Sequence, residues 1–142
     1  LDLRPSILDT LGLLPALNWL VSSLDSDHNI DGRLEVGGQI RALKPEVDVA
    51  IFRIVQEALS NVSRHSGATT VCVRVNYLPR LLKLSIQDNG IGFTLPKLIA
   101  SYSHERKIGL LGMHQRARSL GGTLNVDTEI GKGTLILVQA PI

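Results

Sequence analysis

Three segments of the chain repeat apolar residues every three to four positions, the spacing of a helix with one buried face. The first covers 6–24, with Ser6 expected as its N-cap and Pro15 as a point where a second helix could begin. The second, 44–67, has a proline near its start, acids in its first turn and a glycine just past its end. The third, 109–122, ends on a pair of glycines.

Three other segments alternate apolar and polar residues, which predicts strands. Residues 30–38 indicate a single short strand, and 68–90 and 123–142 each indicate a hairpin. Between them, 90–108 shows no clear period, and so long an irregular connection is typical of a functional lid or a disordered segment. This order predicts an α+β two-layer sandwich, a mostly antiparallel sheet with helices on one face and a long lid.

Composition narrows the class of protein. The 142 residues fit one domain, 44% of them are hydrophobic and 20% are charged, as in ordinary globular proteins. A net charge of +2 gives no reason to expect nucleic-acid or membrane binding, and the lone Cys72 indicates a reducing compartment. The chain opens on Leu1 without a methionine, so it is either a processed protein or the end of a longer one. We expect the second, with this part cytoplasmic and the membrane anchoring of the parent protein left open.

One polar stripe interrupts the longest predicted helix. Arg53, Glu57, Asn61 and His65 are four residues apart and therefore share one face. A solvated polar face is the commoner meaning of such a stripe. Alternatively, an amide and a carboxylate one turn apart suit a hard cation such as Mg²⁺, which prefers oxygen ligands and is usually shared with substrate phosphates.

Glycines gather at three further places. The first, 88–93 (DNGIGF), follows a predicted strand, where an aspartate and two glycines suit either an ordinary turn or close backbone approach to a flat ligand. The second, 109–113 (GLLGM), is expected to open a helix whose free N–H groups bind an anion, or else to act as a hinge. The third, 131–134 (GKGT), is by itself a hairpin turn.

The order and spacing of these motifs together resemble the GHKL ATP-binding fold of sensor histidine kinases, gyrase-type topoisomerases, heat-shock chaperone ATPases and mismatch-repair ATPases. Segments 52–68 (FRIVQEALSNVSRHSGA) and 109–122 (GLLGMHQRARSLGG) are similar to histidine kinases paired with helix-turn-helix-output response regulators. The opening 3–13 (LRPSILDTLGL) is similar to the join between dimerisation helix and catalytic domain in that group. The resemblance implies that 1–10 end a linker and that 11–142 form the catalytic ATP-binding domain.

The resemblance also implies roles for individual residues. Asp88 would accept a hydrogen bond from the adenine amine, and Gly90 and Gly92 would let the backbone lie against the base. Asn61 would ligate Mg²⁺, with Glu57 holding a metal-bound water or acting as a base. The phosphate side would comprise Arg64, His65, Lys107, Gly109, Leu110, Leu111 and Gly112, with Thr134 reaching the adenine edge through water. Lys107 stands where the family often has a glycine, and both phosphate contact and stiffening of the lid are open roles for it.

The implied activity is ATP-dependent histidine phosphorylation in a two-component system. The chain's four histidines, His28, His65, His104 and His114, do not lie on a dimerisation-type helix, so the acceptor is expected on a helix outside this chain. The implied partners are ATP or ADP, that dimerisation and phosphoacceptor helix, and a response-regulator receiver domain, with no nucleic acid and no direct membrane contact. Alternatives are another GHKL ATPase, an anti-sigma serine kinase, or a degenerate module that has lost catalysis.

Overall fold

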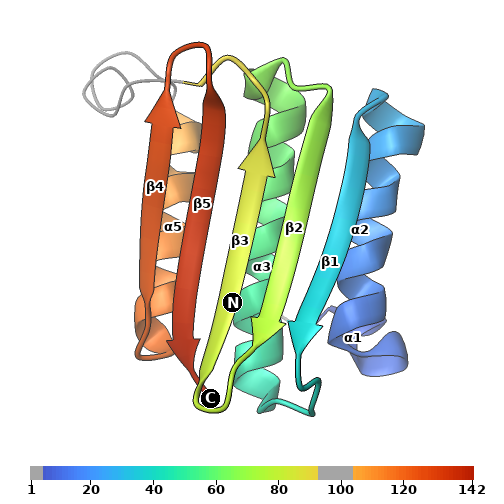
Figure 1. The fold of residues 1–142 in the computed structure, drawn as a ribbon, viewed down its shortest axis with the longest axis vertical. Coiled ribbons are helices and arrows are strands. Elements are labelled where there is room, and N and C mark those ends of the chain that lie inside the picture. The colour runs from blue at the N-terminus through green and yellow to red at the C-terminus, as the bar shows by residue number, and fades with distance from the viewer. Residues whose placement is uncertain (1–4, 93–103) are drawn as a thin grey trace.

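The computed structural model describes residues 5–92 and 104–142, except for the side chains of His65 and residues 104–107. A five-stranded sheet in the order β1-β2-β3-β5-β4 carries helices on one face (Figure 1). This arrangement confirms the predicted two-layer α+β class. The elements are α1 (Ser6–Leu11), α2 (Leu13–His28), β1 (Asp31–Gly38), α3 (Pro45–Asn61), the π-helical turn η1 (Val62–Ser66), β2 (Thr70–Tyr77), β3 (Leu81–Asp88), α5 (His104–Ser119), β4 (Thr123–Glu129) and β5 (Gly133–Pro141).

The sheet is antiparallel except at one edge. β2 pairs with β3, β3 with β5, and β5 with β4, all antiparallel, as the two predicted hairpins require. β1 instead runs parallel to β2, because α3 carries the chain across the sheet between them. α3 lies centrally behind the sheet, and its C-terminal end is at the same end of the sheet as the end of β3 (Figure 1).

Strand alternation sorts side chains into a core layer and an open face. In β2, Val71, Val73 and Val75 are buried against the helices, whereas Arg74 is exposed on the other face. α3 meets this layer with a continuous apolar stripe whose most buried members are Ile51, Phe52, Ile54, Val55 and Ala58. The core therefore lies between the sheet and the helices, and the open face is mostly polar.

The first helical segment is broken in a place that the spacing did not predict. Gly12 adopts a positive φ of 86° and separates α1 from α2, so Pro15 lies within the first turn of α2, where a missing N–H is tolerated. The expectation that Ser6 is an N-cap is wrong. Pro5 occupies the cap with no side-chain hydrogen bond, and its carbonyl accepts the Leu8 N–H at 3.1 Å.

The expectation that Gly109 opens a helix is also wrong, because α5 begins at His104. Glu, Arg and Lys, which fill 105–107, have high helix propensity and extend the helix upstream of the glycines. The last residues of the predicted lid, 104–108, are therefore helical. Residues 93–103 of that predicted lid lie outside the described residues.

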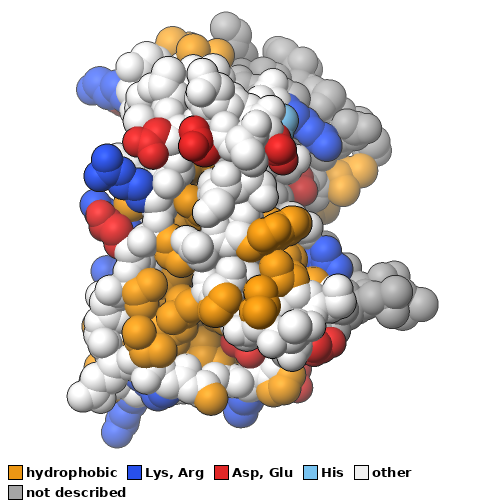
Figure 2. Space-filling model, turned by 90° about the vertical axis from the view of Figure 1, so that its right-hand side faces the viewer, with side chains coloured by type: hydrophobic (Ala, Val, Ile, Leu, Met, Phe, Trp, Pro, Cys, Tyr) orange, Lys and Arg blue, Asp and Glu red, His pale blue; other side chains and the backbone are white. Residues whose placement is uncertain are grey.

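One side of the molecule carries exposed apolar side chains (Figure 2). Hydrophobic groups gather there over α1, α2 and β1. Exposed residues of these elements and of the segment after β1 include Leu11, Trp19, Val36 and Ile40, and the Trp19 side chain is 54% exposed. Among the described helices, none has the length and apolar character needed to span a membrane.

Candidate functional site

Asp88 is the one carboxylate that strand alternation turns into the core layer among the described residues. In β3 the inward positions are Leu82, Leu84, Ile86 and then Asp88, and all four are buried. The Asp88 side chain is only 8% exposed, and its Oδ1 accepts the Gly90 N–H at 2.8 Å. A buried carboxylate needs such a hydrogen bond, because desolvation would otherwise be costly. Across the β3–β5 ladder Asp88 pairs with Thr134, which is half-buried.

A pocket opens beside this carboxylate. Ile86 and Ile136 come from the strands, Asn61 comes from α3, and Leu110 comes from α5. The complete lining is Ala58, Asn61, Val62, Ser66, Ile86, Asp88, Gly92, Leu110, Val126, Thr134 and Ile136. Apolar walls with a few converging polar groups are typical of small-molecule sites. The cavity measures only about 30 Å³, so a ligand the size of a purine requires the lining side chains to move apart.

The end of α3 changes geometry where it meets the pocket. Asn61 is the last α-helical residue, and the following Val62–Ser66 form a π-helical turn. Such turns occur mostly as single-turn bulges in α-helices and are frequent at functional sites. Ser66 Oγ donates to the Val62 carbonyl at 2.7 Å and accepts the Ala68 N–H at 3.0 Å. This serine therefore fixes both the turn and the exit of the chain from it.

The loop after Asp88 packs tightly against two neighbouring segments. Ile91 N–H donates to the Ser66 carbonyl at 2.8 Å, and the Ile91 carbonyl accepts the Gly131 N–H at 2.6 Å. Gly92 has a φ of 68°, and a β-carbon there would overlap the Glu129 carbonyl. The glycine pattern thus lets the π-helical turn, this loop and the β4–β5 turn approach one another around the pocket mouth.

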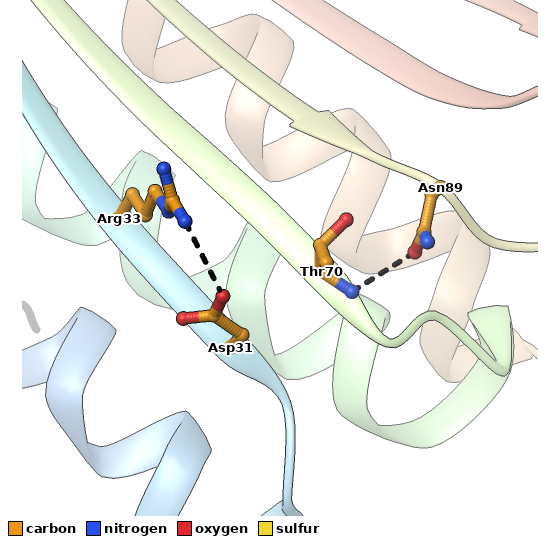
Figure 3. Close-up of polar contacts among 4 residues, drawn as sticks. All are labelled: Asp31, Arg33, Thr70 and Asn89. Carbon is orange, nitrogen blue, oxygen red and sulfur yellow. Dashed lines mark hydrogen bonds and ion pairs between the residues drawn. The ribbon is translucent and has the colours of Figure 1, made fainter.

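Asn89 joins β2 to β3 on the outer side of the same loop (Figure 3). Its Oδ1 accepts the Thr69 N–H at 2.9 Å and the Thr70 N–H at 3.0 Å, and its Nδ2 donates to Thr69 Oγ1. On the adjacent strand, Arg33 and Asp31 form an ion pair at 3.8 Å. Asn89 is therefore held by the backbone of β2, which leaves the neighbouring Asp88 to face the pocket.

A second hollow, of about 350 Å³, runs between α3 and α5. Glu57 lies in it, one turn before Asn61 on α3, and is half-buried. α5 approaches this carboxylate through Gly109, where a β-carbon would overlap Glu57 Oε1. We call this hollow the α3–α5 groove. Its lining is Arg53, Gln56, Glu57, Ile108, Gly109, Gly112, Met113 and Arg116.

The structure brings together most of the residues expected in a nucleotide site, but not all. Five of them line the pocket, namely Asn61, Asp88, Gly92, Leu110 and Thr134, and three line the α3–α5 groove, namely Glu57, Gly109 and Gly112. Gly90 is buried beside Asp88. Arg64 and Leu111 are exposed and line neither hollow. Lys107 falls within α5 and His65 within the π-helical turn, and their side chains lie outside the described residues.

The glycines of α5 differ most from expectation. Gly109 to Gly112 lie inside α5, so their N–H groups belong to the helix's own hydrogen-bond ladder and are not the free donors of a helix start. Anion binding by these N–H groups would require the beginning of α5 to unwind.

Sequence reasoning gave no role to several lining residues. Ile86 and Ile136 could have been found, because each lies two positions from a polar site residue on the same strand face. Arg53 was visible in the polar stripe, and Arg116 lies one turn beyond Gly112 on α5. Ser66 carried no signal, because nothing in its neighbours announces a π-helical turn.

Comparison with known families and curated proteins agrees with this geometry. Residues 46–142 match the family described as Histidine kinase-, DNA gyrase B-, and HSP90-like ATPase. The Bacillus subtilis signal transduction histidine-protein kinase/phosphatase DegS is 37% identical over 142 residues, covering 98% of this chain and 36% of DegS. The sensor histidine kinase LiaS of the same organism is 39% identical, covering 100% of this chain and 38% of LiaS. The chain thus spans under two fifths of the length of either relative.

Solved structures share the fold. The histidine kinase domain of the Erythrobacter litoralis EL346 blue-light activated histidine kinase superposes with a TM-score of 0.71 at 20% identity, covering 88% of this chain and 58% of that domain. The mycobacterial sensor histidine kinase MprB gives a TM-score of 0.66 at 21% identity, covering 89% of this chain and 92% of the MprB chain. At such identities the likeness concerns the fold.

Proposed function

Because the chain belongs to the histidine kinase-, DNA gyrase B- and HSP90-like ATPase family, we propose that it is the catalytic ATP-binding part of a sensor histidine kinase. Its substrate is ATP, and its acceptor is a histidine on a dimerisation helix outside this chain, from which the phosphoryl group passes to a response-regulator receiver domain. The observation that carries the proposal is the buried Asp88 in an apolar pocket of a chain that sensor kinases match from end to end. We place this activity in the cytoplasm, where ATP is available.

Adenine recognition follows from the pocket walls. Once the pocket opens, a flat, apolar base would lie between Ile86, Val126 and Ile136, while the Asp88 carboxylate would accept a hydrogen bond from the exocyclic amine. Thr134 Oγ1 lies 2.9 Å from Thr128 Oγ1 and would serve the adenine edge through water. Gly90 and Gly92 hold the loop close enough for the backbone to border the base.

The donor set along α3 suits a hard cation. Asn61 supplies a neutral amide oxygen and Glu57 a carboxylate from the same half-buried face, one turn apart. Asn61 would hold Mg²⁺, with Glu57 acting through a bound water, and the cation would supply charge neutralisation for the phosphates. Arg64, His65 and Lys107 are the proposed basic contributors at the phosphate side.

Phosphoryl transfer asks the protein for position and charge compensation more than for covalent chemistry. The lone pair of a neutral imidazole nitrogen forms the N–P bond while the bond from phosphorus to the β–γ bridging oxygen breaks. ADP leaves with that electron pair, and the ring's N–H proton passes to solvent. Because the imidazole nitrogen already carries a lone pair, Glu57 serves this reaction by organising the site, whereas hydrolysis would need it as a general base.

Calorimetric titration of this chain with ADP and with a non-hydrolysable ATP analogue tests the proposal. We expect binding of both, with Asp88→Asn lowering both affinities by roughly 10- to 100-fold through loss of a charge-assisted hydrogen bond. Asn61→Asp, or EDTA in place of Mg²⁺, should weaken the ATP analogue more than ADP. Asp127→Asn is the matched control, because Asp127 is an exposed carboxylate on β4. Absence of binding at millimolar nucleotide would remove the proposal.

A further inference from the structure

Two arginines on different helices face the same hollow. Arg53 of α3 and Arg116 of α5 both line the α3–α5 groove together with Glu57, and both side chains are half-buried. Among the described lining residues there are two cationic side chains and one anionic side chain. The groove is therefore a positively charged hollow with room for an anionic group and its water. Neither arginine has a role in the proposed contacts to the base, the cation or the phosphates.

The position of the groove along α3 follows the expected path of a nucleotide. Asn61 lines the pocket, Glu57 lines the groove, and Arg53 lies one turn further from Asp88, each step of four residues being about 6 Å. A nucleotide whose base lies against Asp88 and whose phosphates pass Asn61 and then Glu57 directs its terminal phosphoryl group toward Arg53. Arg116 approaches the same point from α5, one turn beyond Gly112.

The side-chain arrangement suits a phosphoryl group. Arg53 Nη1 donates to Gln56 Oε1 at 2.9 Å, which holds the guanidinium along the surface of α3. A guanidinium offers five donors in a planar fork that matches phosphate oxygens, and it stays charged at any physiological pH. Two of them from opposite walls supply the directional donors that the helical N–H groups of Gly109 to Gly112 do not provide.

We propose that Arg53 and Arg116 bind the terminal phosphoryl group of ATP and thereby make this site distinguish ATP from ADP. The inference rests on the proposed function, since it assumes that the base occupies the Asp88 pocket. It assigns the arginine pair to the phosphoryl group that ADP lacks. Substitution of the arginines should therefore leave unchanged the binding of the part that ATP and ADP share.

The test is the ratio of two affinities, measured by calorimetry with Mg²⁺ for ADP and for a non-hydrolysable ATP analogue. Arg53→Gln and Arg116→Gln should each lower the affinity for the ATP analogue by about tenfold or more while changing that for ADP less than about twofold. Arg53→Lys should recover part of the loss, because it keeps the charge but not the fork. Arg118→Gln, which removes an exposed arginine of the same helix, should leave the ratio unchanged.

Two results would overturn the inference while leaving the proposed function standing. A parallel fall of both affinities would mean that the arginines support the fold, and unchanged affinities in both glutamine variants would mean that they do not contact the terminal phosphoryl group. If the unaltered chain binds neither nucleotide, the proposed function itself fails and the inference falls with it.

Discussion

Charged side chains on the two faces of the sheet have different surroundings. On the open face, Arg33 pairs with Asp31 and Arg74 with Glu35 at 2.5 Å, and all four side chains are more than half exposed. On the helix side, the carboxylate of Asp88 lies among Ile86, Ile136 and Val126. Exposed pairs exchange one hydrated state for another and contribute little, whereas a buried carboxylate must be hydrogen-bonded or meet a ligand. Burial of a charge therefore locates this site better than the density of charges does.

The largest expected effect on stability comes from a substitution in the loop beside the buried Asp88. Gly92→Ala adds a β-carbon that overlaps the Glu129 carbonyl and forces a non-glycine residue to a φ of 68°. We expect the free energy of unfolding to fall by about 2–4 kcal/mol in urea denaturation. Gly131→Ala is the matched control, since its φ is also positive, at 84°, but nothing lies within 4 Å of the added carbon. That variant should lose only about 1–2 kcal/mol, and equal losses would show that backbone strain alone matters.

An intermediate effect on stability should come from Tyr77, another ionisable group turned toward the core. Burial raises the pKa of Tyr77 above its ordinary value of 10.0, nearby Asp48 raises it further, and Arg41 acts in the opposite direction. Folding thus favours the neutral phenol, so its contribution is complete below pH 10 and is lost as the pH rises toward the folded-state pKa. As the pH is raised beyond about 10, the urea concentration at the unfolding midpoint should decrease. The decrease should be less steep in Tyr77→Phe. A decline of equal steepness in both proteins would contradict this assignment.

The smallest expected effect on stability comes from substitutions around Cys72 on the open face of the sheet. Burial raises the pKa of the Cys72 thiol, and the Glu35 carboxylate adds to the rise while Arg74 opposes it. Since the thiolate is the reactive form, Cys72 should react with iodoacetamide more slowly than free cysteine at pH 8. Glu35→Gln should speed the reaction modestly and leave the urea midpoint almost unchanged, while Arg74→Gln should slow it. A rate equal to that of free cysteine would show that the surroundings of Cys72 do not act on its titration.

Periodicity predicted the elements of this fold well, because each buried layer imposes its own repeat on the sequence. For that reason the sequence predicts β2 and β3 from their alternation and α3 from its apolar stripe. The same alternation predicts that Asp88, two positions after Ile86, is on the inward face of β3. The parallel pairing of β1 with β2 was not readable, since strand neighbours depend on where α3 packs and not on local spacing.

Helix ends were predicted least well, for physical reasons that differ from case to case. At Gly12 the backbone breaks the first helical segment before Pro15 can mark a start. At His104 the helix begins within a charged stretch that has no apolar period but has good intrinsic propensity. The sequence suggested no role for the groove arginines, because Arg53 and Arg116 line one hollow only when α3 and α5 pack together.

The position of Trp19 has a spectroscopic consequence. It is the chain's single tryptophan, lies exposed on α2, and lines neither the pocket nor the α3–α5 groove. Its emission should therefore stay constant as nucleotide is added, yet shift to shorter wavelength when another polypeptide covers that part of α2. The native chain thus carries an intrinsic optical reporter for protein docking on α2 that should not respond to occupation of the pocket.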